Sequence, residues 1–127
     1  MRVDPSGSRF GWHFTSGDDP AQSVYRDGTP LSTKWLPPLA PILCEQGYHA
    51  SERLLDALEH APGCVLSRTE HAGEIRSEHD KFCSAQRRSV ASVAFRPALI
   101  MFARWCAQRA AAEAMRTQPG IVQVKPF

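Results

Sequence analysis

The sequence lacks any hydrophobic run long enough to cross a membrane, since no apolar stretch approaches the roughly 18 to 20 residues that a spanning helix needs. Its start, MRVDPSGSRF, also lacks the apolar centre of a secretory signal peptide. These two absences argue against a membrane protein and against export. We therefore expect a cytoplasmic protein that makes no contact with a membrane.

Cysteine is scarce, with four residues in the chain, and without an export signal these favour reduced thiols over a disulfide framework. The hydrophobic content of 43% and the charged content of 22% are typical of a globular protein and exclude a disordered one. A length of 127 residues suits one hydrophobic core. We expect a flexible N-terminus over residues 1–9, which are mostly polar, and a single globular domain over residues 10–127.

The charge is distributed unevenly along the chain. Residues 1–67 carry five Lys/Arg and eight Asp/Glu, whereas residues 68–127 carry ten Lys/Arg and five Asp/Glu. Such a basic second half favours an acidic protein surface or a nucleic acid as a partner. In the alternative interpretation, the two halves neutralise each other across one globule.

Short extended segments dominate the first two thirds of the chain. The alternation in RFGWHF predicts a half-buried strand, and Asp27-Gly28 predicts a hairpin turn within a region of loops. PILCEQGYHAS predicts a short strand, a turn at Gly47 and a second extended piece. CVLSRTEHAGEI predicts another strand that ends at a turn over Ala72-Gly73. GIVQVKPF fits either an edge strand or a free tail.

Two helices are predicted, over about residues 52–61 and 97–116. Ser51 is the expected N-cap of the first, because its hydroxyl can accept a bond from an amide of the first turn. The apolar spacing places Leu54, Leu55, Leu58 and Ala61 on one buried face of the first helix, and Leu99, Phe102, Ala103, Cys106 and Ala110 on that of the second. The fold class is α+β, with two helices packed on a small, mostly antiparallel sheet.

Several motifs together resemble a known family. The segments are GWHF, YRDGTPL, LCEQGYHASERLLDALEHAPG, GEI, DK and FARWCA, within residues 10–110. They are similar to a domain of unknown function found in phages, prophages and high-GC bacteria, whose members often continue into Ala/Trp-rich repeats that this sequence lacks. It also departs from the family at Glu78-His79-Asp80-Lys81, where an acidic pair before Lys is usual. The resemblance implies an origin in mobile genetic elements and no specific chemistry.

The GYHAS block followed by a helix is also similar to the core of the ADP-ribosyltransferase fold. This likeness implies an NAD-using enzyme in which His49, Tyr48 and Ser51 contact the cofactor. Glu70 or Glu74 would be the acidic partner, and His13 is the candidate for the residue on the first strand. In the alternative interpretation, His49 is structural and donates a hydrogen bond to buried backbone.

A zinc site is a second chemical alternative. His60 and Cys64, like His79 and Cys83, are separated by four positions, and neutral imidazole with thiolate suits tetrahedral zinc. Against this, His60 and Cys64 lie on opposite sides of Pro62-Gly63. We favour the interpretation in which Cys44, Cys64 and Cys106 are buried as small apolar residues, with no metal or other cofactor.

The preferred interpretation is an interaction protein without a catalytic set, encoded by a phage or prophage. We expect it to bind and inhibit a host protein or ribonucleoprotein complex, as an anti-CRISPR inhibitor of host defence does. A nucleic-acid-binding accessory protein remains an alternative, which the Arg87-Arg88 pair supports weakly. The expected partner contacts are basic residues and exposed aromatic residues: Arg76, Lys81, Arg87, Arg88, Arg96, Arg104, Tyr25 and Trp35.

Overall fold

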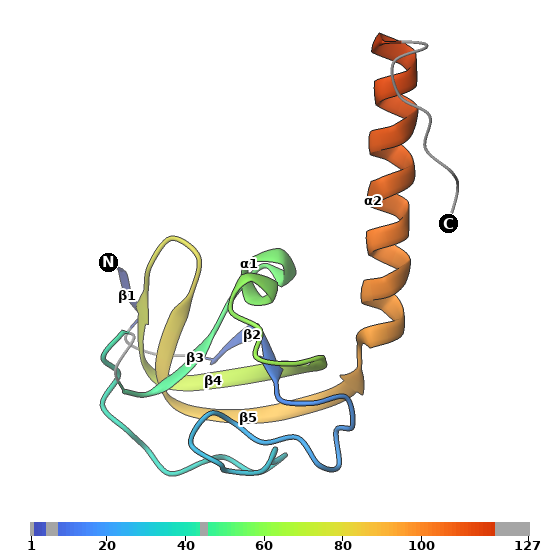
Figure 1. The fold of residues 1–127 in the computed structure, drawn as a ribbon. Helices are drawn as coiled ribbons and strands as arrows, with labels where there is room; N and C mark the ends of the chain where they lie inside the picture. Colours follow the sequence, from blue (N-terminus) through green and yellow to red (C-terminus); the bar gives the residue numbers. More distant parts are fainter. Residues whose placement is uncertain (1, 5–7, 44–45, 119–127) are drawn as a thin grey trace. The chain divides into compact units, whose positions relative to one another are not determined.

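The computed structural model describes residues 2–4, 8–43 and 46–118 (Figure 1). Along the chain it contains β1 (Arg2–Asp4), β2 (Ser8–Thr15), β3 (Tyr48–Ala50), α1 (Leu54–Glu59), β4 (Val65–Ser77), β5 (Phe82–Ala94) and α2 (Arg96–Thr117). The chain divides into two compact units, Met1–Ala94 and Phe95–Phe127, whereas a single domain was expected. The α+β class and the two helices are confirmed.

The first unit is a five-stranded antiparallel sheet built around a long β4–β5 hairpin. β1 and β2 both pair with β4, and β3 pairs with the free edge of β5. A bridge between Trp12 and Ser51 then joins β2 to β3, with hydrogen bonds of 2.7 and 3.0 Å. The sheet therefore curls until β2 and β3 meet, as the ribbon shows (Figure 1).

Several local predictions were wrong. The turn predicted at Ala72-Gly73 is absent, and β4 continues through both residues. Gly73 has a positive φ of 78° and lies at a register shift, so this position is a bulge within the strand. Ser51 does not cap α1, since it is buried in the bridge to Trp12 and Arg53 occupies the N-cap position. The buried residue of α1 is Ala57, not the predicted leucine stripe.

Part of the segment expected to be loose lies in the sheet. Residues 2–4 form β1 against residues 75–77, because the open edge of β4 offers them backbone hydrogen-bonding partners. Residues 1 and 5–7 lie outside the described residues, as do Cys44 and the GIVQVKPF segment.

The small apolar core lies between β2, β3, β4 and β5. Ala50, Ile75 and Phe82 form its buried cluster. A Cβ atom on Gly11 would lie 2.8 Å from both the Ala50 Cβ and the Phe82 Cζ atoms. The strands approach this closely only because position 11 has no side chain.

Much of the remaining interior is polar. Among the described residues, ten buried residues are polar or charged and nine are hydrophobic. Ser84 Oγ donates to the Gln86 carbonyl oxygen (2.8 Å), so it accepts from His71 Nδ1 (2.7 Å), and His71 Nε2 accepts from Thr69 Oγ1 (2.8 Å). Burial and the nearby Arg87 lower the pKa of His71 well below its usual value, so the ring is neutral and its Nε2 atom is the acceptor in this pattern.

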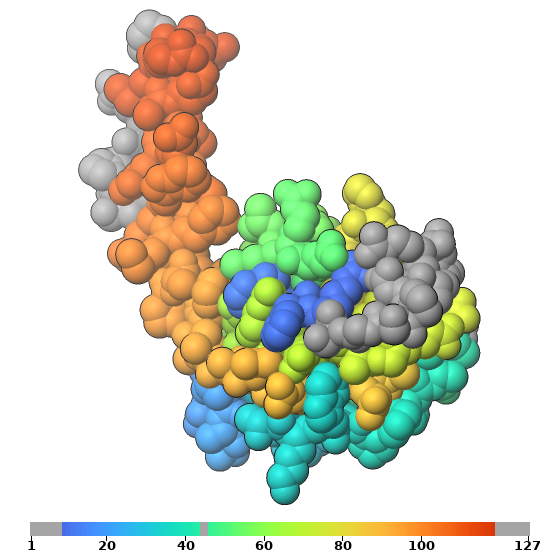
Figure 2. All heavy atoms as spheres, turned by 180° about the vertical axis from the view of Figure 1, so that it is seen from behind, coloured from blue at the N-terminus to red at the C-terminus, as the bar shows by residue number. Residues whose placement is uncertain are grey.

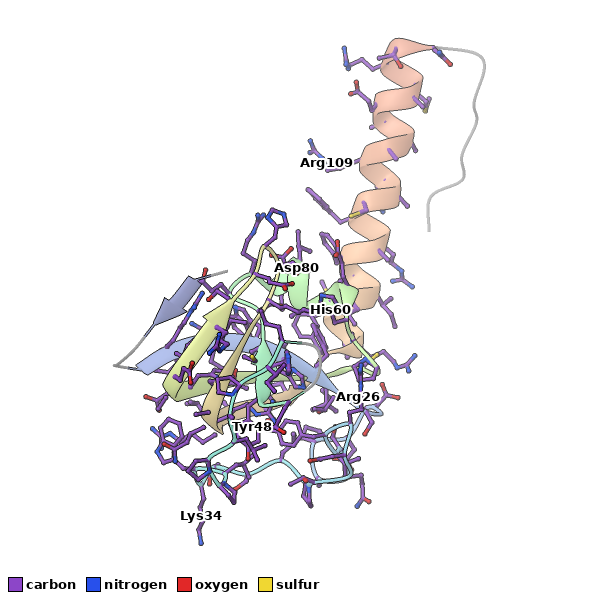
Figure 3. The ribbon with its side chains drawn as sticks, turned by 90° about the vertical axis from the view of Figure 1, so that its left-hand side faces the viewer. Arg26, Lys34, Tyr48, His60, Asp80 and Arg109 are labelled. Atoms are coloured by element: carbon purple, nitrogen blue, oxygen red, sulfur yellow. The ribbon has the colours of Figure 1, made fainter. Side chains whose placement is uncertain are left out.

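The second unit contains α2, a helix of 22 residues with no buried residue among those described. The predicted buried stripe is therefore wrong, because Phe102 and Cys106 are exposed and Leu99 is only partly covered. Phe102 and Trp105 stack at 6.2 Å between ring centroids, and the Arg109 guanidinium lies 5.0 Å from the Trp105 ring (Arg109 is labelled in Figure 3). Neither helix in the described part of the chain has the length and apolar character that crossing a bilayer requires.

Candidate functional site

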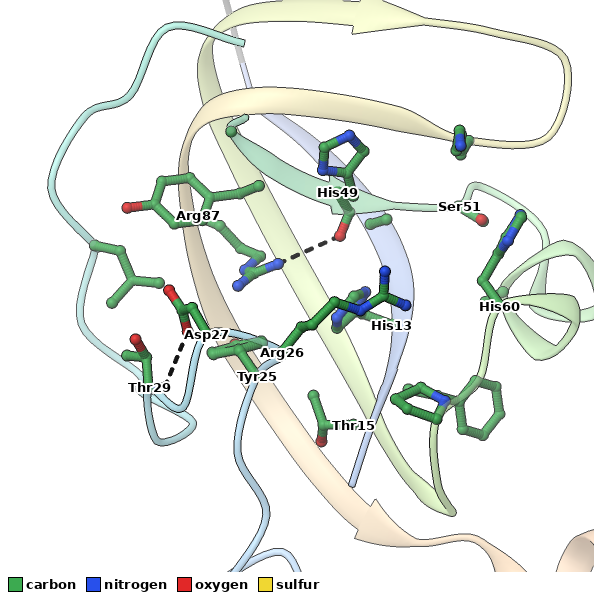
Figure 4. A pocket seen from close by; sticks show the side chains of 18 of the residues that line it. His13, Thr15, Tyr25, Arg26, Asp27, Thr29, His49, Ser51, His60 and Arg87 are labelled. Carbon is green, nitrogen blue, oxygen red and sulfur yellow. Dashed lines mark hydrogen bonds between the residues drawn. The ribbon is translucent and has the colours of Figure 1, made fainter. Parts of the chain in front are cut away.

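The curled sheet has a pocket of about 660 Å³ on its concave side (Figure 4). β2 and β3 contribute one wall, the turn over residues 25–29 and the segment over residues 36–39 contribute another, and the end of α1 closes the rim. Segments that are distant in sequence therefore meet at this pocket, which makes it the candidate site.

The turn over residues 25–29 is the predicted hairpin, and the structure confirms it. Val24 and Pro30 form a bridge, Gly28 adopts a positive φ of 91°, and its amide donates to the Tyr25 carbonyl oxygen (2.9 Å). Asp27 accepts from the Thr29 amide (2.9 Å), and this bond lowers the pKa of the Asp27 carboxyl. The turn thus holds Arg26 and Asp27 at the pocket wall.

The segment over residues 36–39, called the strap below, is fixed along β5. The Leu36 amide donates to the Arg87 carbonyl oxygen and the Leu39 amide to the Ala85 carbonyl oxygen, both at 2.9 Å. The Tyr48 hydroxyl donates to the Pro37 carbonyl oxygen at 2.6 Å. In the space-filling view this part of the chain, in cyan, lies against β5, in orange (Figure 2). Three hydrogen bonds therefore hold the strap as a wall of the pocket.

Arg87 is the central charged residue of the site. It is only 4% exposed, and its guanidinium lies 3.8 Å from the Tyr25 ring and 5.0 Å from the Tyr48 ring. Its Nη1 atom donates to the His49 carbonyl oxygen (3.3 Å), and its Nε atom has no hydrogen-bond partner among the described residues. Burial lowers the pKa of Arg87. No described carboxylate forms an ion pair with it.

Two histidines beside Arg87 are held in their neutral form. Burial, followed by the Arg87 charge, lowers the pKa of His13 to about 3. Burial also lowers the pKa of His49, with further contributions from Lys81 and Arg87. Near neutral pH both rings therefore offer hydrogen bonds without adding charge.

The charged residues of the lining are mostly cationic. Arg26, Lys81 and Arg87 face one carboxylate, that of Asp27. With His13 and His49 neutral, the cations of the lining outnumber its one carboxylate, which favours an anionic ligand. Figure 4 shows Arg26 directed toward His13 and across the pocket from Asp27 and Arg87.

The residues expected of an NAD-using enzyme are only partly brought together. Tyr48, His49, Ser51 and His13 all line the pocket. Glu70 instead forms an ion pair with Arg88 (2.6 Å), and Glu74 forms one with Arg76 (2.7 Å), so neither lies in the lining. The pocket therefore has the expected cofactor contacts without the expected acid.

The four residues of the zinc alternative do not converge. His60 Nε2 lies 3.0 Å from Asp80 Oδ2, an exposed pair that links the end of α1 to the β4–β5 turn (Figure 3). Cys83 is buried in β5, and Cys64 precedes β4. Among residues 2–4, 8–43 and 46–118, no group of three or more His, Cys, Asp or Glu side chains is placed to hold a metal.

Two of the expected partner contacts are buried. Arg87 and Tyr25 are buried at the pocket, whereas both were expected at the surface. Arg76, Arg88 and Trp35 do have exposed surface, Arg96 and Arg104 are exposed on α2, and Lys81 lines the pocket. Sequence reasoning missed Arg26 and Asp27 as site residues.

A signal for Arg87 was present in the sequence. Successive strand residues point to opposite faces, so at most one of Arg87 and Arg88 lies on the outer face of β5. The register bears this out, with Arg87 opposite His71 and Arg88 opposite Glu70.

Comparisons with protein-family models, curated proteins and solved structures found no match for this chain.

Proposed function

We propose that the first unit is a binding domain for a small anionic ligand, which the pocket holds with Arg87 as its principal cation. The observation that carries this proposal is a nearly buried guanidinium without a carboxylate partner among the described residues. Removing an ion from water costs several kcal/mol in proteins. Two tyrosine rings, one carbonyl oxygen and the more distant Asp27 charge offset part of this cost, and a bound anion would offset more of it.

The remaining features of the pocket support the same proposal. A volume of about 660 Å³ lies within the roughly 300 to 1,000 Å³ that is usual for small-molecule sites. Arg26 and Lys81 add positive charge, while His13 and His49 add neutral donors or acceptors. The geometry favours binding over NAD-dependent transfer, because Glu70 and Glu74 lie outside the lining.

The test is isothermal titration calorimetry with inorganic pyrophosphate as a probe for the anion site. We expect Arg87→Gln to weaken binding by about tenfold or more, because it removes the buried charge. Arg88→Gln is the matched control, since Arg88 is the next residue of β5 and pairs with Glu70 instead. We expect the control to remain within about twofold of the wild type. No binding by the wild type, or equal binding by Arg87→Gln, would overturn the proposal.

A second candidate function rests on α2. We propose that this helix carries an interaction with a host macromolecule, the inhibitory, anti-defence role that is the preferred interpretation of the sequence. The supporting observation is that Met101 is 70% and Trp105 53% exposed on a helix with four arginines and one glutamate. Exposed apolar residues flanked by positive charge are typical of a helix that docks into an acidic groove of another protein.

The experiment for this candidate is an affinity purification from lysate of the bacterial host, followed by reconstitution with the purified partner. We expect Trp105→Ala to weaken the complex by about tenfold or more, because aromatic anchors dominate such interfaces. Ala103→Ser is the control, since position 103 lies on the opposite side of the helix. A partner that binds both variants equally would rule out this surface.

A further inference from the structure

We infer that the ligand of this pocket joins its anionic group to a flat apolar group, as an aryl phosphate ester does, and that the apolar group lies on the strap. This inference rests on the proposed anion site and names the class of molecule that would occupy it. It is based on the apolar part of the lining, beside the cations described above.

The lining combines its cations with an apolar surface that the protein leaves uncovered. Trp12, Leu36, Pro37, Leu39 and Tyr48 all contribute to the pocket. Leu39 is 42% exposed even though it faces this pocket. Apolar surface gains about 25 cal/mol for each Å² that a ligand removes from water. A purely ionic ligand would leave this gain unused.

Hydrogen bonds hold the apolar surface next to the central cation, Arg87. The Leu36 amide donates to the carbonyl oxygen of Arg87 itself, at 2.9 Å. The Tyr48 ring lies 5.0 Å from the Arg87 guanidinium, and its hydroxyl is bonded to the Pro37 carbonyl oxygen at 2.6 Å. Both contacts hold the strap beside the charge. One small molecule can therefore reach both surfaces at once.

The shape of the apolar wall favours a flat group. The side chains of Pro37 and Tyr48 are rings, and a planar group buries more area against ring faces than a flexible chain of similar size. A rigid planar group also loses less conformational entropy on binding than an alkyl chain. These two effects select an aromatic group over an aliphatic one.

The test compares phenyl phosphate with methyl phosphate at pH 8, measured by calorimetry on the complete chain. The two probes carry the same anionic group and differ in the ring. We expect phenyl phosphate to bind about tenfold more tightly, which corresponds to roughly 1.4 kcal/mol from apolar burial. n-Hexyl phosphate serves as the flexible apolar comparison and is expected to bind less tightly than phenyl phosphate.

Variants separate the two surfaces of the pocket. We expect Leu39→Ser to lower the affinity for phenyl phosphate several-fold more than the affinity for methyl phosphate, whereas Arg87→Gln lowers both. Leu55→Ser is the matched control, since Leu55 is 54% exposed on α1 and is absent from the lining. Thermal melts of each variant confirm that it is folded.

The outcomes distinguish this inference from the proposal beneath it. Equal affinity for phenyl and methyl phosphate would contradict the inference of an aromatic group and would still agree with the proposed anion site. Tighter binding of n-hexyl phosphate would replace the flat group by an aliphatic one. Failure of every phosphate probe to bind would overturn both.

Discussion

The inside of the curled sheet and the surface of α2 have opposite compositions. The sheet encloses Thr69, His71, Ser84 and Arg87, whereas the helix exposes Met101 and Trp105. Buried polar groups and exposed apolar groups both cost stability unless another contact compensates for them. Hydrogen bonds among Thr69, His71 and Ser84 provide this compensation inside the sheet, and we propose that a small ligand provides it for Arg87 and a macromolecular partner for the helix.

The largest expected effect tests whether the sheet unit nevertheless depends on its small apolar core. Phe82→Ala should lower the free energy of unfolding by about 3 to 5 kcal/mol, because it leaves a cavity beside Ala50 and Ile75. Trp105→Ala should change it by less than about 0.5 kcal/mol, since the ring is largely exposed. Urea denaturation of both variants provides the measurement. A similar loss in both would remove the contrast between the two regions.

The next effect concerns the neutral histidines of the interior. The pKa values of His71 and His13 are lowered in the folded chain, so below pH 6.5 the unfolded chain binds more protons and stability falls with falling pH. Between pH 7 and pH 5 the loss should be about 2 kcal/mol for each fully buried histidine. Both histidines contribute, because the pKa of His13 is lowered to about 3 and that of His71 well below its usual value.

Urea denaturation at pH 7 and pH 5 measures this loss. The window avoids the carboxyls of Asp27 and Asp80, whose pKa values are lowered from 3.8 and whose stabilising contribution disappears only at more acidic pH. His71→Gln is expected to reduce the dependence on pH. Equal stability of the wild type at both pH values would show that the interior histidines are not held neutral.

The smallest effect separates ligand binding from folding at the pocket. Arg87→Met should change the free energy of unfolding by less than about 1 kcal/mol, in either direction, because the apolar side chain removes a buried charge that has no carboxylate partner among the described residues. Calorimetry with pyrophosphate should at the same time show that binding is lost. A stability loss as large as that of Phe82→Ala would mean that Arg87 maintains the fold.

The sequence predicted several elements from one local rule each. The alternation around Trp12 located β2, the Asp27-Gly28 pair located the hairpin, and the apolar spacing located both helices. It failed where tertiary contacts outweighed local preference. Ser51 has the chemistry of an N-cap, but pairing with Trp12 buries it in a bridge.

The site was harder to predict than the fold. His49, Tyr48 and Ser51 were candidates because the GYHAS block resembles the core of the ADP-ribosyltransferase fold. Arg26 and Asp27 reach the pocket through a turn that is distant in sequence, and no periodicity reveals such an approach. Arg87 was misplaced because two adjacent arginines suggest a charged surface, although strand geometry separates them by face.

The junction between β2 and β3 has a consequence for motion. Two backbone hydrogen bonds between Trp12 and Ser51 join these strands, and both residues also line the pocket. Local fluctuations that break so short a junction cost far less than global unfolding. Amide hydrogen exchange at Trp12 and Ser51 should therefore be faster than in the centre of the β4–β5 hairpin, and a bound ligand should slow it. Opening of this junction would give molecules a transient route into the interior of the sheet.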